Sequence, residues 1–346
     1  MIQTKRGKCL FLLSAAMLLV CVILFSLHSG QIAVPIYTAV YEMGTFFGIS
    51  MPGPIPKPEE IAVFWYIRMP RLCVALLAGA ALSASGAVMQ GVFANPLADP
   101  GIIGVSSGAS FGAVICIALG LTSVSMYYMP IFALVGALGA VAAAVILTYH
   151  GGRIPPMSLL LAGVAVSIFL GAMTNGILTF VNEYRLKEFL FWMVGGLDYR
   201  RWEHVWLAAP PVLTGIVFLI VMGRHLNTLS LGDEEARGLG MNVLFYRSLF
   251  LFTASLITAA SVCVSGMIGF VGLVIPHITR LLLGPDHRLL IPAAALLGAF
   301  FLLFCDTLGR IIAPPLEIRV GIMTALIGAP YFLYLIRRMR KKGGLL

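Results

Sequence analysis

Six cysteines and six histidines are the residues of this chain that could hold a metal or carry redox chemistry. No two cysteines form a Cys-x-x-Cys pair, and all lie in or beside apolar runs, where cysteine usually serves as a small buried residue. The histidines fall near the ends of the apolar runs, so no two could face each other at mid-membrane depth as axial haem ligands do. We therefore predict no catalytic residue, no metal site and no cofactor.

The chain also lacks the chemistry that would power a pump by itself. It contains no G-x-x-x-x-G-K-[ST] phosphate-binding loop, so we predict that it does not hydrolyse ATP. Charged residues are almost absent from the interiors of the apolar runs, and Asp306, within a turn of one end, is the nearest exception. Because ion-coupled carriers need ionisable groups at membrane depth, a transporter with this sequence must take its energy from a partner.

The composition is that of a membrane protein. Of the 346 residues, 60% are hydrophobic and only 11% are charged, whereas a soluble domain has about 25% charged residues. The apolar runs are continuous, unlike the alternating strands of a membrane barrel. Because a helix pairs its own backbone groups in lipid, we predict an all-α polytopic membrane protein.

Ten apolar runs predict ten transmembrane helices in a single transmembrane domain spanning residues 1–346. They cover residues 9–27, 71–93, 102–119, 129–149, 158–180, 204–222, 246–265, 266–282, 291–309 and 319–336. The first has basic residues ahead of it but no convincing cleavage site after it, so we expect it to be retained. The eighth is short and contains Pro276, which predicts a broken helix.

The distribution of charge predicts the orientation in the membrane. If both termini are cytoplasmic, the inner segments carry the whole formal net charge of +9 and the outer segments carry none. All four tryptophans then fall at outer boundaries, as expected of an aromatic belt. The mixed charged and aromatic stretch 183–203 predicts a short amphipathic helix on the outer surface. The basic composition thus needs no nucleic-acid partner.

One inner loop, residues 229–242, is polar and short and connects two predicted spans. Three acidic residues starting at Asp233 would lie in the first turn of a helix, where negative charge is favourable, and Gly238 and Gly240 would end it. Two interpretations are open: a coupling helix that sits in a groove of an ATPase, or an ordinary capped loop helix.

Several motifs occur in collinear order between about residues 60 and 340. They are Arg68-Met-Pro-Arg71, the stretch from Asn95 to Gly108, Leu160-Leu-Ala-Gly163, Phe191-Trp-Met-Val-Gly-Gly196, Gly266 to Arg280 and Gly328-Ala-Pro330. Together they closely resemble the iron-siderophore and cobalamin permease family of type II ABC importers, often called the FecCD family. The resemblance implies the type II ABC importer permease fold, with ten helices in each subunit of a homodimer or of a pair of similar subunits.

The resemblance also implies the partners. The permease would lie in the bacterial inner membrane, with two ATPase subunits docking from the cytoplasm and a substrate-binding protein from outside, and the cargo would be moved intact. It leaves that cargo open among ferric siderophore, haem and cobalamin. The alternative from a different class is a secondary carrier of a bulky solute, and a membrane-embedded redox enzyme lacks any ligand cluster to carry its chemistry.

The family's docking arginines correspond here to Arg68, Arg71 and Arg310. They are expected to stand exposed on the outer face and to receive glutamates of the binding protein, because arginine holds a carboxylate bidentately. A two-fold dimer would present the set twice to a two-lobed partner. The alternative is that these side chains merely snorkel to the interface from helix ends.

The family's coupling positions correspond to Gly232, Glu235, Ala236 and Gly240. Its inner gate, at the cytoplasmic start of the fifth helix, corresponds to Pro156 and Met157. Small polar residues can occur at that gate in the family, so its apolar residues here predict closure by apolar contact. The turn 95–101 is expected to be structural, with Asn95 or Asp99 capping the third helix.

Overall fold

The computed structural model describes residues 4–30, 34–49 and 52–341, and within them it is helical apart from turns, irregular links and one bridge between His150 and Arg153. A helix corresponds to each of the ten predicted spans. These helices are α1 (Lys5–His28), α4 (Met69–Val92), α5 (Val105–Ala118), α6 (Tyr128–Thr148), α7 (Pro156–Leu178), α9 (Trp202–Val221), α12 (Val243–Ser265), α13 (Val271–Leu283), α14 (His287–Ile311) and α15 (Val320–Lys341). Among the described residues, seven helices are long and apolar enough to cross a membrane, and α5, α13 and α15 are shorter apolar helices.

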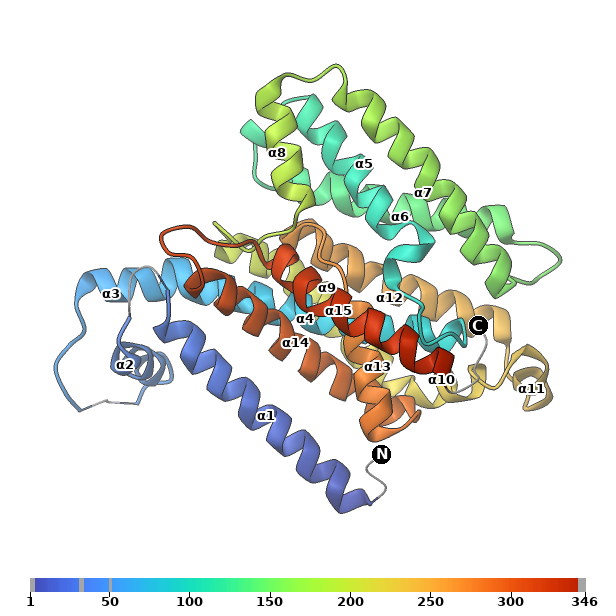
Figure 1. Cartoon of the computed structure of the whole chain (residues 1–346), viewed down its shortest axis with the longest axis horizontal. Coiled ribbons are helices and arrows are strands. Elements are labelled where there is room, and N and C mark those ends of the chain that lie inside the picture. The colour runs from blue at the N-terminus through green and yellow to red at the C-terminus, as the bar shows by residue number, and fades with distance from the viewer. Residues whose placement is uncertain (1–3, 31–33, 50–51, 342–346) are drawn as a thin grey trace.

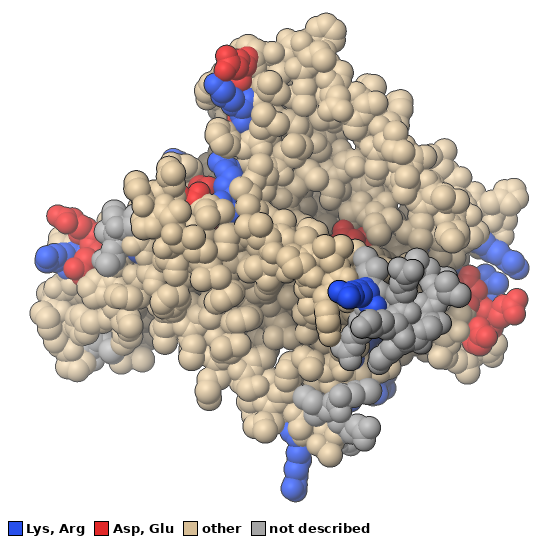
Figure 2. Space-filling model, viewed as in Figure 1, with Lys and Arg blue, Asp and Glu red and all other residues tan. Residues whose placement is uncertain are grey.

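Short helices mark the two ends of this bundle (Figure 1). One end, which we call the outer end, carries α2 (Ile36–Phe46), α3 (Pro58–Val63) and α8 (Glu183–Met193). The opposite, inner end carries α10 (Gly223–Leu229) and α11 (Asp233–Gly238). Figure 2 shows that the charged side chains visible on this face lie mostly toward the two ends, with a broad uncharged surface between them. That distribution matches a bundle surrounded by lipid.

Three of the outer elements differ from the sequence-based expectations. The outer amphipathic helix was expected over residues 183–203, but α8 ends at Met193 because Gly195, with φ +74°, turns the chain. The second span begins earlier than expected, because α3 and a π-helical turn, Phe64–Arg68, continue directly into α4. Helix α2 was not expected at all, since its sequence is too short and too mixed to give a spanning signal.

Helix α4 is the centre of the bundle and packs against α12, α13 and α14. Its small residues allow this close approach. A Cβ on Gly79 would collide with the carbonyl of Gly298 in α14, and a Cβ on Gly298 would collide with that of Gly79. Small residues at four-residue spacing therefore bring helix backbones into contact, as the sequence of this span predicts.

Helices α5 to α8 form a second group, seen at the top of Figure 1. Helix α5 packs closely on α6, where Gly108 meets the backbone of Gly136, and both pack on α7. Helix α6 in turn packs on α12, which joins the group to the central helices.

Two helices are too short to cross a bilayer alone. With 14 and 13 residues, α5 and α13 are about 21 and 20 Å long, against about 30 Å of hydrocarbon. Each is extended by an irregular segment. Residues 95–104 turn back into the bundle before α5, so that the Ile102 carbonyl packs against Gly163 of α7. Such backbone is tolerated at membrane depth where protein surrounds it.

The second irregular segment, residues 266–270, precedes α13 and corrects the expected eighth span. The break lies here, where Gly266 has φ +72° and Phe270 has φ +69°, and not at Pro276, which lies inside α13. A proline removes the hydrogen bond to the carbonyl four residues earlier, which is that of Gly272. Gly86 of α4 packs directly on this carbonyl. The carbonyl that Pro276 leaves without its helical hydrogen bond therefore lies at a close helix crossing.

The capping expectation for the turn 95–101 is also wrong in part. Asp99 accepts a hydrogen bond from the Gly101 backbone N–H at 2.8 Å, so it caps the short 3₁₀ turn Pro100–Ile103 instead of α5. Helix α5 starts after Gly104, whose φ of +94° suits glycine.

Replacing Gly86 by alanine should destabilise the protein, because the new methyl group would collide with the Gly272 carbonyl. We expect a loss of about 1–3 kcal/mol, measured as a lower thermal unfolding temperature in detergent. Gly139 of α6 is the matched control, because nothing lies within 4 Å of a Cβ at that position. Equal unfolding temperatures for the two alanine variants would contradict the close α4–α13 crossing.

Candidate functional site

The three arginines singled out from the sequence meet at the outer end. Arg68 and Arg71 are three residues apart at the start of α4 and therefore share a helix face. Arg310 lies in the last turn of α14, which packs on α4. All three line one small pocket of about 140 Å³.

Two of these arginines are buried, and the expectation that they stand exposed is wrong. Arg68 and Arg310 are only 6% and 7% exposed. Arg68 donates to the Ser26 carbonyl at 3.0 Å, and Arg310 donates to the Ser29 carbonyl at 3.0 Å and to the Ser26 hydroxyl at 2.6 Å. The last carbonyls of a helix are unpaired and carry partial negative charge, so they attract cations. The two arginines thus hold the end of α1 against the bundle.

Arg71 is the centre of an ion-pair network. Its guanidinium binds Asp306 of α14 through Nε at 3.1 Å and Nη2 at 2.8 Å. It also contacts Glu317, in the loop before α15, at 2.7 Å and Asp198, in the loop after α8, at 3.3 Å. Asp306 is 2% exposed and additionally pairs with Arg310 at 3.3 Å. Paired charges of this kind can be buried where single ones cannot.

A wider pocket of about 660 Å³ opens beside the small one and shares Arg71 and Glu317 with it. Its lining includes three further arginines that the sequence analysis missed: Arg200, Arg201 and Arg319. Burial lowers the pKa of Arg200, in the loop before α9, to about 10, which leaves it charged at neutral pH. The adjacent pair Arg200-Arg201, next to a boundary tryptophan, was the signal that could have found them.

The same wide pocket has aromatic walls. Arg319 lies over the ring of Phe191, with 4.6 Å between the guanidinium carbon and the ring centroid. Tyr199 is 94% exposed and has a left-handed φ of +57°, a conformation that costs energy for a bulky side chain. An exposed aromatic ring held in a strained backbone indicates a contact surface.

At the inner end, the expected short helix is present as α11. It begins after Gly232, with φ +122°, and ends before Gly240, with φ +81°. Ala236 is fully buried, whereas Glu235 is exposed. The helix therefore keeps one face on the bundle and presents the other to the inner side.

Two large apolar residues flank the exposed face of α11. Leu231 is 61% exposed and Leu239 is 68% exposed. Exposed leucines on a charged loop that lies outside the apolar belt are unusual for a surface in contact with water alone, and they are typical of a protein contact surface.

Arg247, which the sequence analysis missed, joins this helix to another predicted site. From the second turn of α12 it binds both oxygens of Asp233, at 2.9 and 2.5 Å, and the Ile154 carbonyl at 3.0 Å. The hydrogen bonds from Arg247 hold the pKa of Asp233 below its usual range, so the pair is intact at neutral pH and is lost only in strong acid. Ile154 lies two residues before Pro156, the first residue of α7.

The predicted gate residues lie at this start of α7. Pro156 is partly buried and Met157 is 70% exposed. The coupling positions and the gate positions, which are about 80 residues apart in sequence, therefore lie on either side of Arg247.

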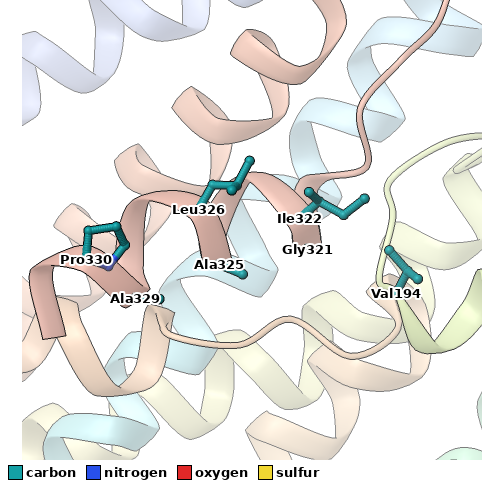
Figure 3. A pocket seen from close by; sticks show the side chains of 7 residues that line it. All are labelled: Val194, Gly321, Ile322, Ala325, Leu326, Ala329 and Pro330. Carbon is teal, nitrogen blue, oxygen red and sulfur yellow. The ribbon is translucent and has the colours of Figure 1, made fainter. Parts of the chain in front are cut away.

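An open apolar groove of about 490 Å³ runs along α15 (Figure 3). Gly321, Ala325 and Ala329 recur there at four-residue spacing, with Ile322 and Leu326 projecting beside them in Figure 3. Gly321 already meets the Val194 carbonyl of its own chain, whereas the small side chains of Ala325 and Ala329 allow another helix to approach closely in lipid.

Asp306→Asn should strongly destabilise the protein, because Arg71 and Arg310 would lose their buried counter-charge. We expect a cost of about 3–5 kcal/mol, observed as a lower thermal unfolding temperature in detergent. Glu317→Gln removes a carboxylate that is 23% exposed and should cost only about 0–1 kcal/mol. If the two variants unfolded at the same temperature, Asp306 would not be the principal partner of the arginines.

Comparisons with known proteins agree with this architecture. The model of a family described as the FecCD transport family matches residues 18–338. The chain is 43% identical over 310 residues to the cobalamin import system permease protein BtuC of Halobacterium salinarum, covering 89% of this chain and 80% of that protein. It is 41% identical over 280 residues to the hemin transport system permease protein HmuU of Yersinia pestis, covering 80% and 83%.

A solved structure also matches. It is described as an inward-facing conformation of a metal-chelate type ABC transporter, and it aligns with a TM-score of 0.83 and 32% identity over 95% of this chain and 99% of that one. The resemblance and the all-helical permease fold expected from the sequence are thereby confirmed, and the secondary-carrier alternative is excluded. The chain belongs to the FecCD transport family and is a multi-pass permease subunit of an ABC importer, distinct from the subunit that hydrolyses ATP.

Proposed function

We propose that this permease moves an intact iron chelate, haem or cobalamin-type complex inward, driven by separate ATPase subunits that bind at α11. The observation that carries the proposal is the family match over residues 18–338. The cargo class is supported by the names of the two relatives, one a cobalamin and the other a hemin permease. In this proposal both termini are cytoplasmic. The start of α1 and the end of α15 lie on the side of α11 (Figure 1), so α11 also faces the cytoplasm.

The ATPase contact consists of the exposed face of α11. Leu231 and Leu239 fill apolar hollows of the partner, while Glu234 and Glu235 remain at the polar rim. Ala236 and the two flanking glycines give the helix its fixed position on the bundle. This division into an anchored and a presented face favours the coupling interpretation over that of an ordinary loop helix.

The substrate-binding protein docks on the arginine-rich outer end. Its glutamates approach Arg71, which lines both outer pockets, and the positive field of Arg200, Arg201 and Arg319 steers them there. Arg68 and Arg310 contribute indirectly, because their hydrogen bonds hold the end of α1 next to this surface. Simple snorkelling is less well supported, because both guanidinium groups point into the bundle and not toward water.

A second permease subunit, a copy of this chain or a similar one, packs on the groove of α15. The cargo then passes along the interface between the two subunits. At its inner end the path is closed by apolar contact through Pro156 and Met157 at the start of α7.

Arg201→Glu should slow the association of the cognate binding protein with the assembled transporter in nanodiscs. Because Arg201 is exposed and lines the wide outer pocket, we expect the association rate constant to fall about tenfold at low ionic strength, with a smaller effect in high salt. Arg224→Glu, at an exposed position of the inner end, is the control and should change nothing. An unaltered rate for Arg201→Glu would remove the docking role of the wide pocket.

Leu239→Glu should weaken ATPase binding. Placing a charge in an apolar hollow of the partner leaves it unpaired, and we expect the dissociation constant of the ATPase subunits to rise at least about tenfold. The control is Phe180→Glu, which adds the same charge at a residue that is 92% exposed beyond the outer end of α7. If both variants retained the ATPase equally in pull-down measurements, α11 would not be its binding site.

A further inference from the structure

Arg247 stands at the point where three parts of the protein meet. It belongs to α12, whose side chains are mostly buried in the centre of the bundle. Its guanidinium reaches Asp233 in α11 and the Ile154 carbonyl in the loop between α6 and α7. One side chain therefore contacts the central helices, the inner helix and the segment that leads into α7.

The hydrogen bonds of Arg247 are buried and have a defined geometry. Arg247 is 3% exposed, and its planar fork meets both carboxylate oxygens of Asp233. A bidentate pair fixes the orientation of the guanidinium relative to the carboxylate as well as the distance between them, and a lysine cannot form such a pair. Ile154 is 2% exposed, so the carbonyl that receives the third bond is itself held within the protein.

The two elements joined by Arg247 have different attachments. Helix α11 packs on α10 and α12, whereas α7 packs on α5, α6 and the turn before α5. Through helix packing alone, movement of α11 would therefore reach α7 only indirectly. The Arg247 guanidinium instead connects the two elements, because it hydrogen-bonds both to Asp233 in α11 and to the Ile154 carbonyl just before α7.

We propose that Arg247 is the positioning residue that transmits displacement of α11 to the start of α7, and hence to the inner end of the transport path. The inference rests on the proposed role of α11 as the ATPase contact. When the bound ATPase subunits move α11, Asp233 pulls the guanidinium, and the guanidinium shifts the Ile154 carbonyl and with it the first turn of α7.

The test uses the whole transporter, with its ATPase subunits, in nanodiscs. A cysteine replaces Ser158, which is exposed in the first turn of α7, and the exposed thiols Cys9 and Cys21 are replaced by serine. The maleimide labelling rate at position 158 is measured without nucleotide and with ATP plus vanadate. We expect the nucleotide-dependent change in this rate to fall at least fivefold in Arg247→Lys, which keeps the charge but loses the fork.

Asp233→Ala is the second variant, because it removes both acceptor oxygens and so breaks the link to α11, while leaving Arg247 its bond to Ile154. It should show the same loss, and in both variants the amount of cargo transported per ATP hydrolysed should fall in parallel. Arg224→Gln, at an exposed arginine of the neighbouring helix α10, is the matched control and should keep the full response. Co-purification of the ATPase subunits verifies that each variant assembles.

Two results would overturn the inference. One is a full nucleotide response in either Arg247→Lys or Asp233→Ala. The other is a labelling rate that differs from that of the parent protein by the same factor with and without nucleotide, which would mean that Arg247 only stabilises the fold. Failure of the proposed ATPase contact itself is detected separately, because Leu239→Glu would then leave ATPase binding unaltered.

Discussion

The constraint on which the rest of this structure depends is that lipid offers no hydrogen bonds to the backbone. Every N–H and C=O within the bilayer must be paired or shielded by protein. Most of the chain meets this condition with long helices, and the two segments that do not, residues 95–104 and 266–270, lie against other helices. Irregular backbone is thus confined to places where the surrounding helices can approach within van der Waals contact, which explains the abundance of glycine at the crossings of α4.

The same lack of solvation governs the charges. Arg71 and Arg310 can be withdrawn from water only because the carboxylates of Asp306 and Glu317 supply the opposite charges at the outer end. The carbonyls that close α1 extend the network, so a cluster that reads from the sequence as a docking surface also holds the first helix in place. The proposed docking role is compatible with this anchoring, because Arg71 still lines both outer pockets. The arginines combine anchoring with a positive field that reaches the outer surface.

At the inner end, a polar connection replaces close packing. Helix α11 is short and is flanked by exposed leucines, and its attachment to the bundle depends on buried Ala236 and on the ion pair between Asp233 and Arg247. The permease therefore combines an interior held by glycine crossings with an inner helix held by a few contacts.

The amino-acid sequence by itself determined the membrane class, a helix at each of the ten apolar runs, the short inner helix and the family, because hydrophobic runs, glycine turns and collinear motifs are local properties. It could not determine that Arg68 and Arg310 are buried against α1, since their partners Ser26 and Ser29 are distant in sequence and are backbone or hydroxyl groups. Nor did it identify Arg247, a lone arginine at a helix start, as the contact between α11 and the segment before α7. From the sequence, the helix was expected to break at Pro276. In the structure this proline lies inside α13, where the Gly272 carbonyl packs against Gly86 of α4. Local patterns specify which segments form helices, but which side chains those helices bring together depends on packing between segments far apart in the chain.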